Sequence, residues 1–408
     1  MGLLEGIKKY SKENPTITTQ HKEAFSMFLE LGFPTQNDEE WKYTSLKKII
    51  SKEYKIENKG EKIHENEIIE SSLGLAEQII FLNGELFKTP EISGVTVTKK
   101  TDKNPKYHDA TTALNAAYAK NGYNIVVEKN TKIAEPLEIL FLTKNSSNNF
   151  IQYNNSILLQ ENSSIKILEN IKNLTQNLCF TNTVTEIKIN HGGALELNKI
   201  QDHSDSQVLI DNTNIVQDNK SCSTINTILL GGAFTRNNLS FIQNGVHCES
   251  NMNGVTALNN NEFGDHHTYI DHKNEKCESN ELYKGVYAGK SNGVFNGKIM
   301  VRPGAQKINA FQANNNLLLS DDCSINSKPQ LEIYADDVKC SHGCTIGQLD
   351  EGALFYMRTR GISEKDARQI LTFAFVAEAL EKITVPSVYE KSKALVEAKL
   401  NITLSIEQ

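Results

Sequence analysis

Short runs of alternating apolar and polar residues dominate the chain between residues 125 and 340. Alternation with a period of two predicts half-buried β-strands, and the runs are separated by Asn, Ser and Gly. No proline occurs between Pro136 and Pro303, so backbone N–H donors are available for β-ladder hydrogen bonds throughout that stretch. The pattern therefore predicts a large, mainly β core.

Two neighbouring segments of this core can be superposed at an offset of about thirty residues. The apolar positions Ile157, Leu159, Ile165 and Ile167 then fall on Ile187, Ile189, Leu195 and Leu197, with polar corners at ENSS and HGGA. Irregular repeats of paired short strands, each too small to bury its own face, favour a stacked β-solenoid. From the pattern alone, a large antiparallel sandwich remains the alternative.

Both ends of the chain have helical patterns. We expect a helical and mixed region over residues 1–124, a β-helix core over 125–340 and a helical region over 341–408. Ser363 and Asp366 form a capping box that opens a helix whose apolar residues cover more than one stripe. That helix is expected to be either deeply buried or shared with a partner.

The most reactive cluster in the sequence lies in residues 331–361, LEIYADDVKCSHGCTIGQLDEGALFYMRTRG. Cys340, His342 and Cys344 alternate, so a strand places all three on one face. A neutral imidazole is an iron ligand or a proton carrier, and a thiolate binds iron or sulfur well. The alternative is that both cysteines are small buried hydrophobes. The rest of the stretch predicts a helix that begins near Asp350 and ends at Gly361.

Two other motifs are weaker. The stretch 285–291, GVYAGKS, has three residues between its glycines where a phosphate-binding loop needs four, so we interpret it as a turn between strands. His266, His267, His272 and Cys277 are possible zinc ligands. Adjacent histidines on a strand point to opposite faces, however, so His266 and His267 cannot both serve one metal without a bulge.

Composition and charge limit the binding partners and the cellular compartment that we expect for the chain. The net charge of −7 over 408 residues gives no electrostatic case for binding nucleic acid or an anionic membrane. Seven cysteines, an odd number in a long chain, favour reduced thiols in a cytoplasm. The start, MGLLEGIKKYSKENP, lacks the apolar core of a signal peptide, so we expect a cytoplasmic protein.

Several motifs carry a resemblance to a known family. ADDVKCSHG followed by GQLDEGALFYMRTRGIS, the stretches 279–322 and 266–272, and LGFPTQNDEEWKYTSL at 31–46 resemble SufD-type members of the SufB/SufD family, which are scaffolds for iron–sulfur cluster assembly. The resemblance reaches both ends of the chain. It implies a right-handed parallel β-helix flanked by helical regions.

The resemblance also implies partners and roles. The chain is expected to be a non-catalytic scaffold that pairs with a SufB-type subunit and binds a SufC-type ATPase through its C-terminal region. His342 and Cys340 lie in the family motif and are implied as a ligand or proton carrier for a nascent iron–sulfur cluster at the SufB interface, whereas Cys344 is the weakest of the three candidates. The implied ATPase contacts are Leu354, Phe355, Arg358, Arg360, Phe373 and Phe375.

No cofactor is expected to stay bound to the chain alone, because one chain offers too few ligands for a stable cluster. Flavin is implied for some complexes of the family, but no residue here locates it.

Three alternative functions remain: a β-helix carbohydrate-active enzyme resembling a polysaccharide lyase, a free-standing homodimer, and the SufB-type scaffold that accepts sulfur. Against the last, Asn314 stands where SufB-type chains carry a sulfur-accepting cysteine.

Overall fold

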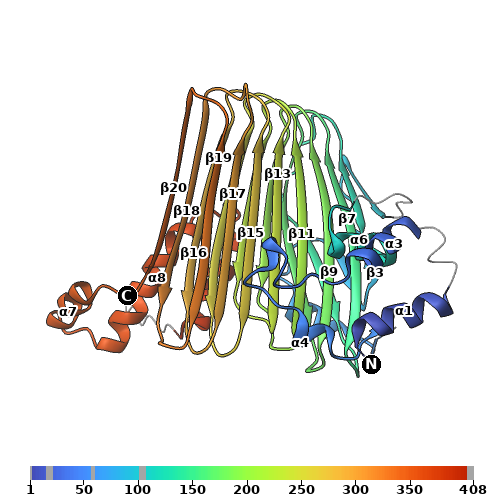
Figure 1. Ribbon diagram of the computed structural model, residues 1–408, viewed down its shortest axis with the longest axis horizontal. Helices are drawn as coiled ribbons and strands as arrows, with labels where there is room; N and C mark the ends of the chain where they lie inside the picture. The colour runs from blue at the N-terminus through green and yellow to red at the C-terminus, as the bar shows by residue number, and fades with distance from the viewer. Residues whose placement is uncertain (1, 15–21, 57–59, 101–106, 402–408) are drawn as a thin grey trace.

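The computed structural model describes residues 2–14, 22–56, 60–100 and 107–401, and at its centre is a solenoid of parallel β-strands (Figure 1). From β5 (Tyr123–Val127) onward, successive strands alternate between two sheets. Sheet A contains β5, β7 (Asn149–Leu159), β9 (Cys179–Ile189), β11 (Gln207–Gln217), β13 (Phe234–Gln243), β15 (Phe263–His272), β17 (Asn292–Val301) and β19 (Ser324–Ile333). Sheet B contains β2 (Glu77–Leu82), β6 (Leu137–Thr143), β8 (Ser164–Asn173), β10 (Ala194–Gln201), β12 (Cys222–Leu229), β14 (Glu249–Leu258), β16 (Glu278–Tyr287), β18 (Ile308–Leu318) and β20 (Val338–Gly347).

Antiparallel pairing occurs only at the N-terminal end of the described strands. There β3 (Glu85–Lys88) pairs with β2, and β4 (Val95–Lys99) pairs with β5. The short β1 (Lys55–Ile56) joins β7 in parallel. The expected mainly β fold with a parallel solenoid core is therefore confirmed, and the antiparallel sandwich is excluded.

The register of the solenoid reproduces the offset of thirty residues. Ile157 is paired with Ile187 across β7 and β9, and Ile165 is paired with Leu195 across β8 and β10. These side chains belong to one apolar core between the two sheets, which continues through the coils to Ala310. Each coil covers apolar side chains of the neighbouring coils. A single repeat would leave these side chains exposed and is therefore too small to fold by itself.

The corners between strands contain residues in the left-handed backbone conformation. Asn162 (φ 56°) and Gly192 (φ 65°) occupy equivalent corners of consecutive coils, within the polar ENSS and HGGA segments. Asn and Gly adopt this conformation more readily than other residues. Polar segments such as ENSS and HGGA therefore mark the points where the chain changes from one sheet to the other.

Helices cover the outer face of each sheet. Sheet A is covered by α1 (Leu3–Glu13), α3 (Lys22–Leu31) and α6 (Ala110–Tyr118), which share a core with Phe150 and Phe180. Sheet B is covered by α8 (Glu364–Leu380) and α9 (Pro386–Lys399), which share a core with Ile228 and Val255. The remaining helical elements are η1 (Glu39–Trp41), α4 (Lys47–Ile50), α5 (Glu65–Ser71) and α7 (Glu351–Thr359).

The wide apolar surface of α8 is thus explained by burial against sheet B and α9. β20 runs across residue 340, where the sequence suggested that the β-helix would end, and β2 to β5 begin before residue 125. Among the described residues, no helix has the length and apolarity required to cross a membrane.

Candidate functional site

The C-terminal end of the solenoid is open. β20 is the last strand of sheet B and β19 is the last strand of sheet A, and in the described part of the chain no strand pairs with their outer edges. An exposed parallel strand presents unpaired backbone N–H and C=O groups and is a template for pairing with another chain. The opposite end differs, because its terminal strands β3 and β4 run antiparallel to their neighbours β2 and β5.

Cys340, His342 and Cys344 lie on this terminal strand, as the alternation predicts. Cys340 is in register with the fully buried Ala310 and packs against the core between the sheets, so these alternate side chains belong to the inner face of the solenoid. Cys340 is half-buried, whereas His342 and Cys344 are exposed. The open end therefore presents inner-face residues to the outside.

The three side chains differ in their surroundings. Burial raises the pKa of the Cys340 thiol, although a backbone hydrogen bond at Ala310 partly offsets this effect. The Cys344 thiol donates to the Ser327 hydroxyl at 3.1 Å, and Ser327 donates to Asn314 Oδ1 at 2.8 Å. The His342 side chain makes no hydrogen bond or ion pair with the described part of the chain, although its backbone belongs to the β18–β20 ladder. The imidazole is therefore the most available ligand of the three.

A metal site is not preassembled. In the described ranges, no group of three or more His, Cys, Asp or Glu side chains is arranged to hold a metal ion. A tightly held cluster needs about four ligands. Within the described ranges, His342 is therefore not part of a complete ligand set.

The sequence analysis missed a polar pair directly behind His342. In register along the inner face of sheet B lie Leu137, Ile167, Leu197, Ile225, Met252, Glu281, Gln312 and His342. The row is apolar through five coils and becomes polar in the last three. Gln312 Nε2 donates to Glu281 Oε2 at 2.6 Å, and both side chains are buried. In the sequence, Glu281 could be recognised as an acidic residue at a position where the preceding strands of sheet B have apolar residues.

The predicted partner residues at the C-terminus divide into two groups. Phe355 is 69% exposed, and Arg358 and Arg360 are exposed on or just after α7. Leu354 is buried, and Phe373 and Phe375 pack partly buried in the core that α8 shares with sheet B. Only the first group is available to a partner, together with Tyr356, which is 59% exposed and which sequence reasoning overlooked.

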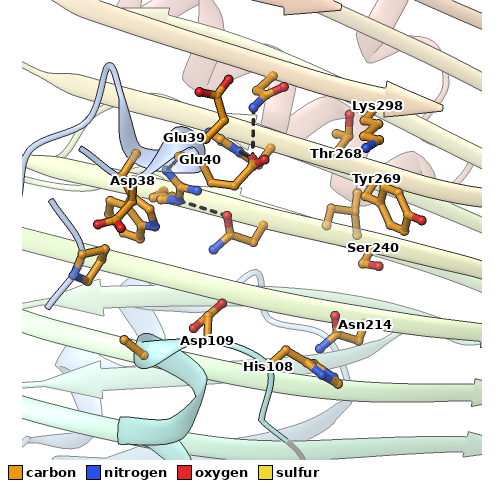
Figure 2. A pocket seen from close by; sticks show the side chains of 18 of the residues that line it. Asp38, Glu39, Glu40, His108, Asp109, Asn214, Ser240, Thr268, Tyr269 and Lys298 are labelled. Carbon is orange, nitrogen blue, oxygen red and sulfur yellow. Dashed lines mark hydrogen bonds and ion pairs between the residues drawn. The ribbon is translucent and has the colours of Figure 1, made fainter. Parts of the chain in front are cut away.

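A hollow of about 770 Å³ lies between the N-terminal segment and the outer face of sheet A (Figure 2). The buried Arg236 stacks on Trp41 at 3.8 Å from its ring centroid and pairs with Asp265 at 2.8 Å. Glu40 accepts from Asn296, and Asp109 caps α6 through the Thr112 N–H. These polar groups are satisfied within the chain, so the hollow marks where the N-terminal segment docks on the solenoid.

The histidines at 266–272 serve the fold. His266 faces inward and contacts Thr256, while His267 faces outward between Asp265 and Glu40, as expected for adjacent residues of a strand. The buried His272 contacts the Ser279 hydroxyl. Residues 288–291 of the apparent phosphate loop form the turn between β16 and β17, as interpreted from the sequence.

The protein is thus a two-sheet parallel β-solenoid that has a histidine and a cysteine on the last strand of sheet B. Residues 141–375 match the family described as SUF system FeS cluster assembly, SufBD core domain, and residues 6–73 match the SufBD protein N-terminal region. The chain belongs to the SufB/SufD family, and this membership supports a role in iron–sulfur cluster assembly.

The chain is similar over most of its length to curated members of this family. It is 29% identical over 387 residues to the iron–sulfur cluster assembly protein SufD of Escherichia coli, covering 92% of this chain and 91% of that protein. It is 27% identical over 428 aligned positions to an iron–sulfur cluster assembly SufBD family protein of Synechocystis, covering 95% and 92%. SufD of Bacillus subtilis is 23% identical over 294 residues, covering 71% and 66%.

Proposed function

We propose that this chain is a SufD-type, non-catalytic scaffold subunit that pairs with a SufB-type subunit through the open end of its solenoid. The observation that carries the proposal is the position of His342 and Cys340 on the terminal strand, β20. A partner that extends the sheets from β19 and β20 would place its own ligands opposite these two side chains. The nascent cluster is then cargo held between two chains.

His342 acts as an iron ligand or proton carrier in this proposal. Its imidazole is exposed and makes no contact with the described chain that would compete with iron. Cys340 is the second candidate ligand, but its thiol must first lose a proton, which partial burial opposes. The Cys344 thiol is hydrogen-bonded to the Ser327 hydroxyl, and we give it a smaller role in binding iron.

A sulfur-accepting role of the SufB type is disfavoured by Asn314. This side chain is buried beside Cys344 in the register and donates no nucleophile, because an amide cannot accept persulfide sulfur. The chain thus supplies ligands, and sulfur enters through the partner. Flavin, if the complex uses it, is assigned to no residue of this chain.

The surface proposed for a SufC-type ATPase is the exposed face of α7, formed by Phe355, Tyr356, Arg358 and Arg360. Figure 1 shows α7 projecting beyond the β20 end of the sheets, on the opposite side of the molecule from the N-terminal helices. An exposed aromatic pair flanked by arginines is a composition typical of interface anchors.

The test is His342→Ala in the co-expressed complex with SufB-type and SufC-type partners. Loss of an exposed side chain changes stability by less than about 0.5 kcal/mol, so complex yield is expected to be normal. Bound iron and sulfide are expected to fall sharply, because no neighbour replaces the imidazole. Ser341→Ala, on the opposite face of the same strand, is the matched control. Normal iron content in an intact His342→Ala complex would falsify the proposed role.

A further inference from the structure

The polar pair behind His342 is unusual for its position. Four earlier residues of the same inner row, Ile167, Leu197, Ile225 and Met252, are buried and apolar, whereas the next two are Glu281 and Gln312, which are 4% and 3% exposed. Burying a carboxyl and an amide costs free energy that an apolar pair would not. The fold alone does not require polar groups at these two positions.

Glu281 holds the Gln312 amide in a fixed orientation. Gln312 Nε2 donates to Glu281 Oε2 at 2.6 Å. Gly297, across the interior on β17, lies so close that a Cβ there would approach Gln312 Nε2 to 2.2 Å, so only glycine leaves room for this amide. The amide nitrogen is thereby fixed from two sides, and its carbonyl oxygen is directed elsewhere.

That carbonyl oxygen is available to His342. Gln312 Oε1 is buried and has no hydrogen-bond partner among the described residues. Gln312 and His342 are direct neighbours in the β18–β20 register, so their side chains lie next to each other on the inner face of sheet B. An imidazole that binds metal through one nitrogen commonly donates its other N–H to a carbonyl or carboxylate, which fixes the ring and its tautomer.

We propose that Glu281 and Gln312 are positioning residues for His342. When a partner covers the open end, the His342 ring turns so that one ring N–H donates to Gln312 Oε1, and the other nitrogen faces the partner and the iron. Glu281 anchors the amide and strengthens its carbonyl as an acceptor. This inference rests on the proposed function of His342 and names the two residues that prepare it.

The raised pKa of Glu281 supports this assignment. Burial raises it to about 7, although hydrogen bonds from Thr268 and Gln312 oppose the shift. The carboxyl therefore holds a proton over part of the neutral range. Perturbed carboxyls of this kind are concentrated at functional sites.

The experiment uses the co-expressed complex with Glu281→Met and Gln312→Met, both of which continue the apolar row. Melting temperature and complex yield are expected to be unchanged or higher, while bound iron falls by about tenfold or more, the range seen when an outer-shell partner of a metal ligand is lost. Glu281→Gln keeps an acceptor for the Gln312 amide and should retain iron. Gln201→Met is the matched control, since Gln201 is a buried interior glutamine paired with Asn237 at 2.7 Å, far from β20.

Higher stability combined with lost iron is the signature of positioning, because a purely structural residue would lose both together. Normal iron in both methionine variants, with iron lost in His342→Ala, overturns the positioning role and leaves the proposed function standing. Failure of the methionine variants to assemble would show a structural role and also overturn it. Normal iron in His342→Ala overturns both proposals.

Discussion

Glu281 is a buried carboxyl whose ionisation is strongly perturbed by its surroundings. Burial raises its pKa from 4.5 to about 7, so the folded chain binds a proton there that the unfolded chain has already released. Between these two values stability falls as pH rises, because the native state binds more protons than the unfolded state. Above pH 7 the full cost of burying the ionised carboxylate is present.

We therefore expect the stability of Glu281→Gln relative to the unmodified chain to depend on pH. A difference of 2.5 pKa units corresponds to roughly 3 kcal/mol, so between pH 5 and pH 8 the free energy of unfolding should shift in favour of the variant by up to that amount. Urea denaturation at both pH values measures this shift. A difference between the two proteins that stays constant with pH would contradict the burial of an ionisable Glu281.

At the residue scale, the sequence located the proposed ligands better than the residues proposed to position them. The alternation of Cys340, His342 and Cys344 predicts that they share a face, and the structure places all three on the inner face of β20. The alternation does not reveal Glu281 and Gln312, because their relation to His342 depends on the register between strands thirty residues apart. The sequence repeat is clear only over residues 157–197, so it does not fix the register of these later strands.

At the scale of elements, the solenoid was predictable because its repeat is local and its register follows from the repeat. The docking of the N-terminal segment was not, since it joins residues more than two hundred positions apart. Thr44 donates to Asp265 at 2.6 Å, and Lys328 pairs with Glu39 on the same segment. Such contacts depend on how the N-terminal helices pack on the outer face of sheet A, which no local sequence pattern predicts.

His267 makes this docking sensitive to pH. Its Nδ1 lies 3.2 Å from Glu40 Oε2, and its Nε2 lies 3.0 Å from Asp265 Oδ1. Burial lowers the pKa of His267, but attraction to Asp265 and hydrogen bonds to Asp265 and Glu40 outweigh burial and the repulsion from Arg236, so the net shift is upward. The contribution of the charged imidazole is complete below the usual histidine pKa and is lost as pH rises through the raised folded value.

Trp41 reports on this contact, because it is the only tryptophan of the chain and stacks on Arg236. We expect its fluorescence to change as pH rises through the raised pKa of His267, as the segment around Glu40 loosens. His267→Gln should remove this transition, and Lys276→Gln, at an exposed corner, is the control. A transition of equal size in His267→Gln would show that another group is responsible.

At the scale of the whole molecule, the two ends of the solenoid are unequal. The N-terminal end terminates in antiparallel pairs, while the C-terminal end terminates in the parallel strands β19 and β20, whose outer edges have no partner strand in the described chain, and carries α7 beside them (Figure 1). Both proposed partner surfaces therefore lie at the same end. Movement of a partner bound to α7 would act directly next to β20, where the nascent cluster is proposed to form.

The final prediction concerns that α7 surface. Deleting everything after Gly361 is a poor test, because α8 and α9 cover an apolar face of sheet B that includes Ile228 and Val255. Their removal would expose this face, and loss of ATPase binding could then result from misfolding. Substitutions on α7 avoid the problem, since exposed side chains contribute little to stability.

We expect the double variant Phe355→Ser, Tyr356→Ser to keep its melting temperature and its SufB-type pairing but to lose co-purification with the SufC-type ATPase. Anchoring aromatic residues at interfaces typically contribute about 2 kcal/mol or more each, so loss of one should weaken binding about thirtyfold and loss of both up to roughly a thousandfold. Phe87→Ser is the matched control, because Phe87 is 63% exposed on β3, at the N-terminal end of the solenoid and far from α7. If the α7 variant retains the ATPase as fully as the Phe87 variant does, the partner surface must lie elsewhere on the molecule.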